Sequence, residues 1–383
     1  MTEFVNGNRI TLLKSGVEYF PALLAEIDAA RQEIHLETYI FESDSTGRAV
    51  AAALAGAARR GVATHLLVDG FGSVDLDRKL VAEMEEAGVR FLVYRPLMSP
   101  WTLRRSRLRR LHRKIAVVDA RVAFVGGINI GDDPVPPRFD FAVRVEGPLV
   151  PHAHRVVKRL WALVNTTRLR ARLPEAAELV PSAQVCGGQR SALVVRDNLG
   201  HRSDIEQEYL AAIAQARSEI LIANAYFFPG QSFRWALMEA AARGVRVALL
   251  LQGKVEYVLQ HYASRALYGT FLDAGIEIHE YQKSFLHAKV AVVDCCWATV
   301  GSSNIDPLSL LLAREANVVI EDAAFASELR ASLLAAVADD AIQVRRESWA
   351  AEPLTVRALM WASYGLARTL TGVFAYGRAK EFT

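Results

Sequence analysis

The sequence contains His112-Arg113-Lys114-Ile115-Ala116-Val117-Val118-Asp119, followed by Gly126-Gly127-Ile128-Asn129, and it repeats this pattern once. The second copy is His287-Ala288-Lys289-Val290-Ala291-Val292-Val293-Asp294, followed by Gly301-Ser302-Ser303-Asn304. Both copies read H-x-K-x4-D-x6-G-[GS]-x-N. The two histidines are separated by the same distance along the chain as the two asparagines (287 − 112 = 304 − 129). So many polar positions at one fixed offset indicate an internal duplication.

An acidic residue follows each motif histidine at the same distance. Asp140 follows His112 at the spacing at which Glu315 follows His287 (140 − 112 = 315 − 287). A carboxylate that binds one ring nitrogen of a histidine orients the ring and stabilises the charged imidazolium. We therefore expect Asp140 and Glu315 to orient one histidine each.

Length and composition limit the class of protein. The 383 residues suffice for two domains that each bury a core. The 45 basic and 42 acidic residues give a net charge of +3, which excludes a grossly basic nucleic-acid binder but allows a local basic patch. Cys186, Cys295 and Cys296 form no disulfide framework, and they fit a reducing compartment.

No targeting signal, membrane span or metal site is expected. The N-terminal segment 1–12 has no apolar core of a secretory signal. No apolar run reaches the roughly 20 residues of a spanning helix. No Cys/His spacing resembles a zinc site. His152 and His154 lie in a predicted helix, and we interpret them as a surface pair rather than as metal ligands.

Upstream of the motif, each half of the chain alternates between helices and strands. Each half begins with a predicted strand, at 9–13 and at 191–196. The elements that follow run helix, strand, helix, strand, at 19–30, 33–39, 50–60 and 62–68 in the first half and at 205–217, 219–226, 233–243 and 245–251 in the second. This alternation predicts an α/β fold with one α/β/α sandwich domain per half.

These patterns give the expected domain boundaries. Residues 1–170 form the first domain, with its motif at 112–129. A linker with two prolines and a Gly-Gly pair follows at 171–188. The second domain covers 189–345, with its motif at 287–304, and a basic tail covers 346–383.

The motif residues suit chemistry at a phosphodiester. The histidine and lysine of each copy are two residues apart, so on a strand they share one face. Lysine and asparagine side chains can hold the non-bridging oxygens as charge develops in the transition state. One imidazole can attack phosphorus, and the other can protonate the leaving alcohol. We expect no metal or other cofactor, because the lysines supply the positive charge. The substrate-binding amides would be Asn129 and Asn304.

The aspartates of the motif leave two interpretations open. Asp119 and Asp294 are included in the predicted catalytic set with His112, Lys114, His287 and Lys289. However, an aspartate at the end of a strand more often forms a turn than takes part in chemistry.

The doubled H-x-K-x4-D motif resembles that of the phospholipase D superfamily, and the resemblance covers most of residues 5–345. It implies two similar α/β domains related by a pseudo-twofold axis, with the active site at their interface. It also implies a metal-independent mechanism through a phosphohistidine. By the order usual in the superfamily, His112 would be the nucleophile and His287 the general acid and base.

Within the superfamily the chain is similar to the bacterial cardiolipin synthases, in particular the B type. The similar segments are Asn8–Leu13, His35–Phe41, Arg144–Pro148 and Arg314–Val318. The A-type synthases begin with two spanning helices, which this sequence lacks. The resemblance implies transfer of a phosphatidyl group to phosphatidylglycerol, giving cardiolipin and glycerol or another released alcohol. The donor would be phosphatidylglycerol or phosphatidylethanolamine.

Two basic stretches bear on the substrate. Residues 101–110 contain five arginines within seven residues, interleaved with Trp101, Leu103 and Leu108. This composition suits an anionic membrane surface, although nucleic acid or a solvated loop would also accept it.

The stretch 354–380 has no acidic residue. Plotted as a helix, it places Leu359, Ala362, Leu366, Leu370 and Val373 on one face and two arginines on the opposite face. This arrangement predicts a helix that lies in the membrane interface, with a helix packed on the protein's own core as the alternative. We therefore expect a peripheral protein on the cytoplasmic face of the bacterial inner membrane, with no nucleic-acid partner.

Two rival functions remain open at this point. A phosphodiesterase would let water instead of a lipid alcohol attack the phosphohistidine, with a phospholipid or nucleic acid as substrate. A non-catalytic membrane-binding protein could keep the fold without the chemistry. The intact motifs argue against that second rival.

Overall fold

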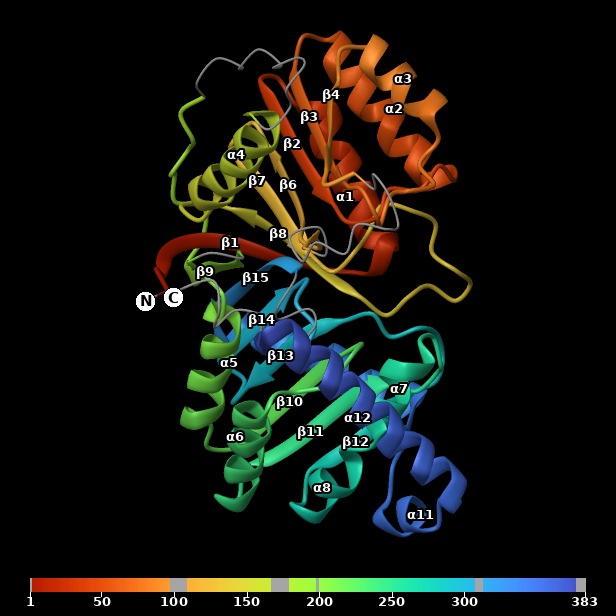
Figure 1. Ribbon diagram of the computed structural model, residues 1–383. Helices are drawn as coiled ribbons and strands as arrows, with labels where there is room; N and C mark the ends of the chain where they lie inside the picture. Colours follow the sequence, from red (N-terminus) through yellow and green to blue (C-terminus); the bar gives the residue numbers. More distant parts are fainter. Residues whose placement is uncertain (1, 97–108, 167–178, 198–199, 307–312, 377–383) are drawn as a thin grey trace. The chain divides into compact units, whose positions relative to one another are not determined.

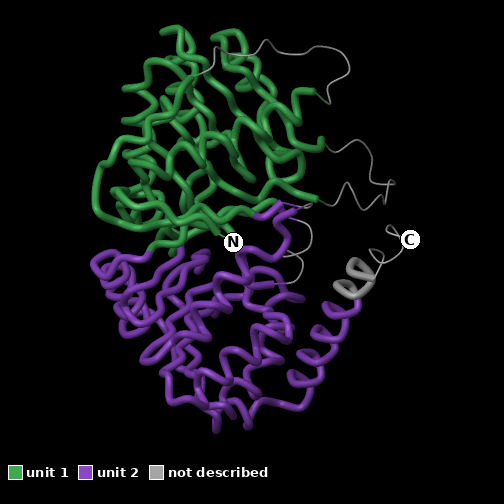
Figure 2. Tube along the Cα trace, turned by 90° about the vertical axis from the view of Figure 1, so that its left-hand side faces the viewer, with its two compact units in different colours: residues 1–195, 300–302, 314–320 green, residues 196–299, 303–313, 321–383 purple. Residues whose placement is uncertain are grey.

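The computed structural model describes residues 2–96, 109–166, 179–197, 200–306 and 313–376, with side chains described as far as residue 369 (Figure 1). The chain divides into two compact units (Figure 2). Unit 1 comprises residues 1–195, 300–302 and 314–320, and unit 2 comprises 196–299, 303–313 and 321–383. Unit 1 therefore includes two short segments from the second half of the chain, of which 300–302 belongs to the second motif copy.

Unit 1 is built on a mixed sheet with the order β15-β9-β1-β8-β7-β6-β2-β3-β4. Strand β2 pairs in parallel with β3 and antiparallel with β6, the strand that begins at the motif lysine. The strands are β1 (Val5–Lys14), β2 (Glu33–Thr38), β3 (Ala63–Asp69), β4 (Arg90–Tyr94), β5 (Arg110–Leu111), β6 (Lys114–Val118), β7 (Val122–Gly126), β8 (Phe141–Glu146), β9 (Gln189–Arg196) and β15 (Ala313–Glu321).

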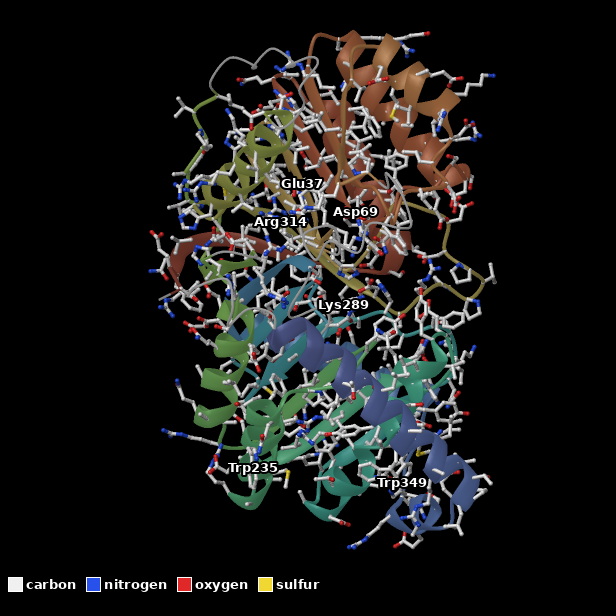
Figure 3. The ribbon with its side chains drawn as sticks, in the orientation of Figure 1. Glu37, Asp69, Trp235, Lys289, Arg314 and Trp349 are labelled. Atoms are coloured by element: carbon white, nitrogen blue, oxygen red, sulfur yellow. The ribbon has the colours of Figure 1, made fainter. Side chains whose placement is uncertain are left out.

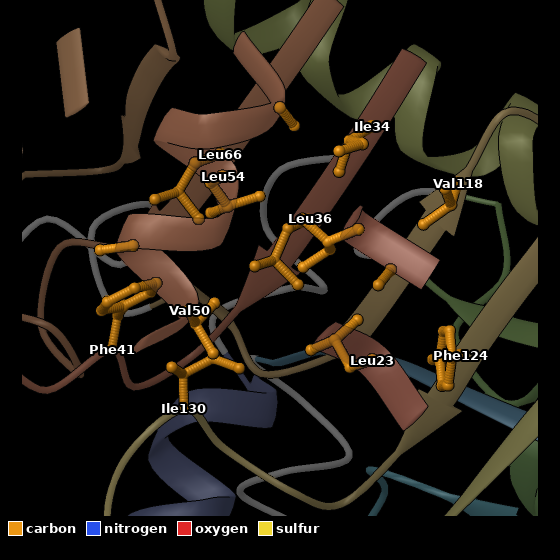
Figure 4. Close-up of a cluster of buried hydrophobic side chains, with 14 of the residues drawn as sticks. Leu23, Ile34, Leu36, Phe41, Val50, Leu54, Leu66, Val118, Phe124 and Ile130 are labelled. Carbon is orange, nitrogen blue, oxygen red and sulfur yellow. The ribbon is translucent and has the colours of Figure 1, made fainter. Parts of the chain in front are cut away.

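Helices cover both faces of this sheet, as Figure 1 shows. The helices are α1 (Ser15–Ala29), α2 (Ser45–Arg59), α3 (Arg78–Glu86) and α4 (Val150–Thr166). Successive residues of β2 point to opposite faces. Ile34 and Leu36 join the apolar cluster under α1 and α2, together with Leu23 and Leu54 (Figure 4). The alternate residues of β2 face α4, where Glu33 contacts a histidine of that helix.

Unit 2 repeats the arrangement with the strand order β16-β12-β11-β10-β13-β14. Strand β10 pairs in parallel with β11 and antiparallel with β13, as β2 does with β3 and β6. Its strands are β10 (Glu219–Asn224), β11 (Arg246–Gln252), β12 (Glu277–Tyr281), β13 (Lys289–Val293), β14 (Trp297–Gly301) and β16 (Ala341–Gln343). Its helices are α5 (Asp204–Gln215), α6 (Gln231–Ala242), α7 (Val258–Arg265), α8 (Tyr268–Asp273), α10 (Ala323–Asp340), α11 (Arg346–Ala350) and α12 (Leu354–Tyr376).

The predicted α/β class and the duplicated order of helices and strands are confirmed. The main difference lies at helix starts. Helix α2 begins at Ser45, ahead of the predicted start at 50. The reason is the Asp44 side chain, which caps the helix by accepting a hydrogen bond from Gly47 N. Apolar periodicity begins only after this first polar turn.

The interpretation of His152 and His154 as a surface pair is wrong for His154. Its side chain is buried, and its Nε2 lies 2.8 Å from Glu33 Oε2. His35 Nε2 lies 2.9 Å from the other oxygen of Glu33. Residues two apart on a helix point in different directions, so one can face the sheet while the other faces solvent. His152 lies 3.4 Å from the exposed Glu3.

The same cluster includes three residues with ligand atoms close enough for a metal ion. Donor atoms of Glu33, His35 and His65 lie within 4.8 Å of one another. However, His65 Nδ1 lies 3.2 Å from Ile34 O, and its Nε2 lies 3.2 Å from the guanidinium of Arg90. Both ring nitrogens of His65 thus have protein partners, and a neighbouring cation opposes metal binding. We interpret the group as a hydrogen-bonded cluster.

The tail forms helix α12, which packs against α7. Among its residues up to 369, those that are buried are Met360, Ser363 and Ala367. The predicted apolar face lies on the exposed side, where Leu359 and Leu366 are both solvent-exposed. The side chains of Leu370 and Val373 lie outside the described residues. Among the described helices, none is long and apolar enough to cross a membrane.

Candidate active site

His112 is paired with the acid of the other motif copy. Its Nδ1 lies 2.9 Å from Oε1 of Glu315, which comes from β15 and is fully buried. The backbone N–H of His112 also donates to the carbonyl of Arg314 at 3.0 Å (Arg314 is labelled in Figure 3). All three residues belong to unit 1. The structure therefore places Glu315 where it can orient His112.

The environment of Glu315 keeps its carboxyl group ionised. Burial alone raises the pKa of this group. The charges of His112 and Lys114 and hydrogen bonds from His112 and Ser302 outweigh burial, so that the pKa of Glu315 lies below its usual value. The Ser302 hydroxyl donates to Oε2 at 2.5 Å. A buried, ionised acid of this kind holds a proton on the ring nitrogen that faces it and stabilises positive charge that develops on the imidazole during a reaction.

Two buried carboxylates position the residues on either side of His112 (Figure 3). Asp69, at the end of β3, accepts a hydrogen bond from Leu111 N at 2.7 Å. Glu37, on β2, forms an ion pair with Arg113 through distances of 2.5 and 3.0 Å. The sequence analysis missed both roles. Polar residues in otherwise apolar strands were the available signal, since a buried carboxylate requires partners.

Lys114 and Tyr39 complete the immediate surroundings of His112. Lys114 is buried, and its Nζ donates to the carbonyl of His112 at 2.7 Å. The centroid of the Tyr39 ring lies 4.8 Å from that of His112 and 5.4 Å from Lys114 Nζ. Tyr39 therefore packs on the imidazole and brings an electron-rich face toward the lysine, which stabilises its charge.

The predicted amide and acid of the first copy lie at strand ends of unit 1. Asn129 Oδ1 accepts a hydrogen bond from Ile40 N at 3.2 Å, which ties the segment after β7 to the segment after β2. Asp140 is buried directly before β8, and its Oδ1 accepts from Phe141 N at 2.8 Å.

The second copy repeats this local geometry in unit 2. Lys289 is fully buried at the start of β13, and its Nζ donates to the carbonyl of His287 (Lys289 is labelled in Figure 3). The backbone groups of both neighbours of His287 are held by hydrogen bonds. Leu286 N donates to the side-chain Oε1 of Gln252 at 3.1 Å, and Ala288 O accepts from Ala225 N at 3.0 Å. Asn304 is buried in the same unit.

The motif aspartates form turns. Asp119 follows β6, at the end of the strand opposite Lys114, and its carboxylate accepts from the backbone N–H groups of residues 31, 32 and 33 at 2.9, 2.7 and 2.9 Å. Asp294 makes the same three contacts with residues 217, 218 and 219, at 2.8, 2.8 and 2.9 Å. Through these hydrogen bonds, each carboxylate joins the end of its own strand to the start of the neighbouring strand. We therefore assign both aspartates to the scaffold rather than to the predicted catalytic set.

The predicted basic stretch at 101–110 lies almost entirely outside the described residues. Arg110 is described, and its guanidinium carbon lies 5.1 Å from the centroid of the Phe71 ring.

Comparisons with known proteins agree with the geometry. The chain matches the family model for the cardiolipin synthase PLD-like domain at residues 23–161 and 209–335. It is 43% identical to cardiolipin synthase B of Escherichia coli (strain K12) over 343 residues, which are 88% of this chain and 82% of that protein. Cardiolipin synthase B of Salmonella typhi is likewise 43% identical, over 344 residues with the same coverage of both chains.

A solved structure supports the fold. Phosphatidylserine synthase from Haemophilus influenzae Rd KW20 matches with a TM-score of 0.72 over 97% of this chain and 96% of that one. Its sequence identity is 12%, so this likeness concerns the fold alone. The resemblance predicted from the doubled motif is thus confirmed. The chain belongs to the cardiolipin synthase family of the phospholipase D superfamily.

Proposed function

We propose that the chain transfers a phosphatidyl group from one phospholipid to the glycerol hydroxyl of phosphatidylglycerol, forming cardiolipin. The observation that carries this proposal is the pair of His112 and Glu315, 2.9 Å apart. Glu315 binds Nδ1, so Nε2 is the nitrogen that we assign to attack on phosphorus. Phosphatidylglycerol as donor would release glycerol, and phosphatidylethanolamine would release ethanolamine.

In the first step, a bond forms between His112 Nε2 and phosphorus while the bond to the head-group oxygen breaks. Glu315 stabilises the positive charge that the imidazole acquires. Lys114 and Lys289 stabilise the negative charge on the non-bridging oxygens, together with the amides of Asn129 and Asn304. This is the step in which fixed, buried charges contribute most.

His287 is the general acid and base of the proposal. It protonates the leaving alcohol and then accepts a proton from the attacking hydroxyl of the acceptor. Asp140, the acid of the first motif copy, keeps its predicted role as the second histidine-orienting acid.

We further propose that α12 attaches the protein to the cytoplasmic face of the bacterial inner membrane. The exposed side of the helix carries Leu359, Trp361 and Leu366. Arg357 and Arg368 are also exposed and suit anionic head groups. The cysteines are all free, which fits the reducing cytoplasm.

The test is lipid analysis of the purified full chain with labelled phosphatidylglycerol in mixed vesicles. Cardiolipin together with released glycerol would support the proposal, provided that both disappear in His112→Ala. His201→Ala is a matched control, because that histidine is exposed and pairs with Asp204. Phosphatidic acid as the sole product would show a hydrolase instead. Turnover of DNA but of no lipid would show a nuclease.

A further inference from the structure

A small pocket in unit 2 is bonded to the segment that carries His287. It is lined at the ends of β10 and β11 and along α7, by residues that include Tyr226, Gln252, Glu256, Tyr257, Gln260 and His261. Two of its lining residues form the hydrogen bonds described above: Gln252 holds Leu286, and Ala225 holds Ala288. The pocket wall is therefore bonded to both neighbours of the proposed acid and base.

The side-chain amide nitrogen of Gln252 lacks a hydrogen-bond partner among the described residues. The residue is 8% exposed, and its Oε1 is occupied by Leu286 N. A buried donor without an acceptor destabilises the folded protein. A ligand oxygen in the pocket would remove this destabilisation.

Glu256 adds a fixed acceptor to the same pocket. Its Oε2 accepts a hydrogen bond from the Tyr226 hydroxyl at 2.5 Å. The Tyr226 ring packs edge-on against Tyr257, with centroids 5.8 Å apart. A carboxylate accepts hydrogen bonds only, so it selects hydroxyl groups and opposes a phosphate in this position. Gln252 thus supplies a donor and Glu256 an acceptor, the combination that a diol satisfies. Lys254 also lines the pocket, and its Nζ donates to the carbonyl of Lys283 at 3.1 Å.

We propose that this pocket binds the glycerol head group of the alcohol substrate, an inference that rests on the proposed function. Gln252 Nε2 donates to one hydroxyl oxygen, and Glu256 accepts from a hydroxyl group. The remaining terminal hydroxyl then lies next to His287. In the transfer step its oxygen bonds to phosphorus, the phosphorus–histidine bond breaks and the hydroxyl proton passes to His287. Free glycerol and the head group of phosphatidylglycerol share this chemistry.

The test compares two alcohols in one reaction. The full chain is supplied with labelled phosphatidylglycerol vesicles and equal concentrations of deuterated glycerol and 1-propanol, and mass spectrometry gives the ratio of the two exchange products. The wild type is expected to favour glycerol. In Glu256→Gln, which keeps an acceptor for Tyr226, and in Gln252→Glu, which keeps an acceptor for Leu286 N, this preference is expected to fall about tenfold, the factor for one lost hydrogen bond of about 1.4 kcal/mol.

A control variant and a second measurement, the Michaelis constant for phosphatidylglycerol, complete the test. Glu239→Gln removes an exposed carboxylate from α6, outside the pocket lining, and is expected to keep the wild-type ratio. Without free alcohols, the Michaelis constant for phosphatidylglycerol in cardiolipin formation should rise in the two pocket variants. If only the free-alcohol ratio changes, the pocket binds soluble glycerol and the head-group assignment is overturned.

The remaining outcomes separate this inference from the proposed function. A wild type that makes cardiolipin, with both pocket variants keeping its alcohol preference, would overturn the pocket assignment alone. A wild type that processes no phospholipid would overturn both.

Discussion

The two motif copies hold their histidines at equivalent positions but with different residues. In the first copy Leu111 N donates to Asp69, and in the second Leu286 N donates to Gln252. Asp69 also accepts bonds from the backbone N–H groups of residues 71 and 72, so its carboxylate is fully engaged. Gln252 keeps an amide donor for another molecule. Duplication has preserved the scaffold while the side chains next to each histidine have diverged.

The acids differ in the same way. Glu315 receives a hydroxyl bond from Ser302 at 2.5 Å. The position equivalent to Ser302 is Gly127 (302 − 127 = 287 − 112), beside Asp140. A Cβ atom at Gly127 would lie 2.3 Å from Asp140 Oδ1, so the first copy has no room for the serine. The first copy thus combines the shorter aspartate with a glycine, and the second copy combines the glutamate with a serine. This difference suits two histidines with different tasks.

The largest expected effect separates the roles of the two histidines. His112→Ala should abolish turnover of every donor, because no nucleophile remains. His287→Ala should lose about 10²–10⁴-fold with phosphatidylglycerol but recover with phosphatidyl-p-nitrophenol, whose leaving group needs no general acid. Initial rates of p-nitrophenol release give the measurement. Equal rescue of both variants would mean that the copies are interchangeable.

Glu315→Gln is expected to lower kcat by about 10³–10⁴-fold, because an amide does not stabilise the imidazolium or its orientation. The Michaelis constant should change little, since Glu315 binds His112 rather than the substrate. Steady-state kinetics on vesicles test this. Glu239→Gln serves as the control, and a variant with wild-type kcat would refute the orienting role.

The serine and glycine can be exchanged between the copies. Ser302→Gly removes one hydrogen bond from Glu315 and should reduce kcat about tenfold. Gly127→Ser should cost more, because the new side chain must displace Asp140. A thermal unfolding curve for each variant distinguishes lost activity from lost folding. A Gly127→Ser variant with wild-type kcat and thermal stability would show that the Asp140 side chain can move.

The last prediction concerns the pH dependence of folding stability around two equivalent buried glutamates. Glu33 contacts His35 and His154, whereas Glu219 contacts Arg246 and Arg330. Arginine stays charged at any working pH, so the cluster of unit 2 should not respond to mild acid.

Unit 1 should respond, because burial, with a smaller effect of the His35 charge, lowers the pKa of His65 to about 3. Between that value and the unfolded pKa near 6.5, the unfolded chain binds a proton that the folded chain does not. Stability therefore falls as pH decreases through this range, by about 2 kcal/mol at pH 5. Glu33, whose pKa is also lowered, adds a loss at still lower pH.

Hydrogen exchange of the β3 and β11 amides at pH 7 and 5 measures the difference between the units. His65→Gln should make β3 as insensitive to this change of pH as β11. The same loss of protection in β3 of that variant as in the wild type would assign the pH response to another group.

The sequence predicted the fold well because the patterns were local. Apolar strands and helices of similar length recur in both halves, and the structure packs these same elements together. The pairing of His112 with Glu315 was not predictable, because histidine and acid have the same spacing in both copies (140 − 112 = 315 − 287). A pattern with the same spacing in both copies does not determine which acid binds which histidine.

The predicted strands at 62–68 and 245–251 place Asp69 and Gln252 at equivalent ends. Which backbone group each side chain binds was not predictable, because Leu111 and Leu286 approach them only through tertiary packing. Burial of His154 depended on the rotation of α4 about its axis, which decides which helix positions face the sheet.

The most direct test of the account is to locate the covalent intermediate. His287→Ala, mixed rapidly with phosphatidyl-p-nitrophenol that carries radioactive phosphorus and quenched in alkali, should retain label in an acid-labile, alkali-stable phosphoramidate. Peptide mapping should place that label on His112, and Glu315→Gln in the same background should reduce its yield. Label on another residue, or p-nitrophenol release without labelled protein, would contradict His112 as the nucleophile.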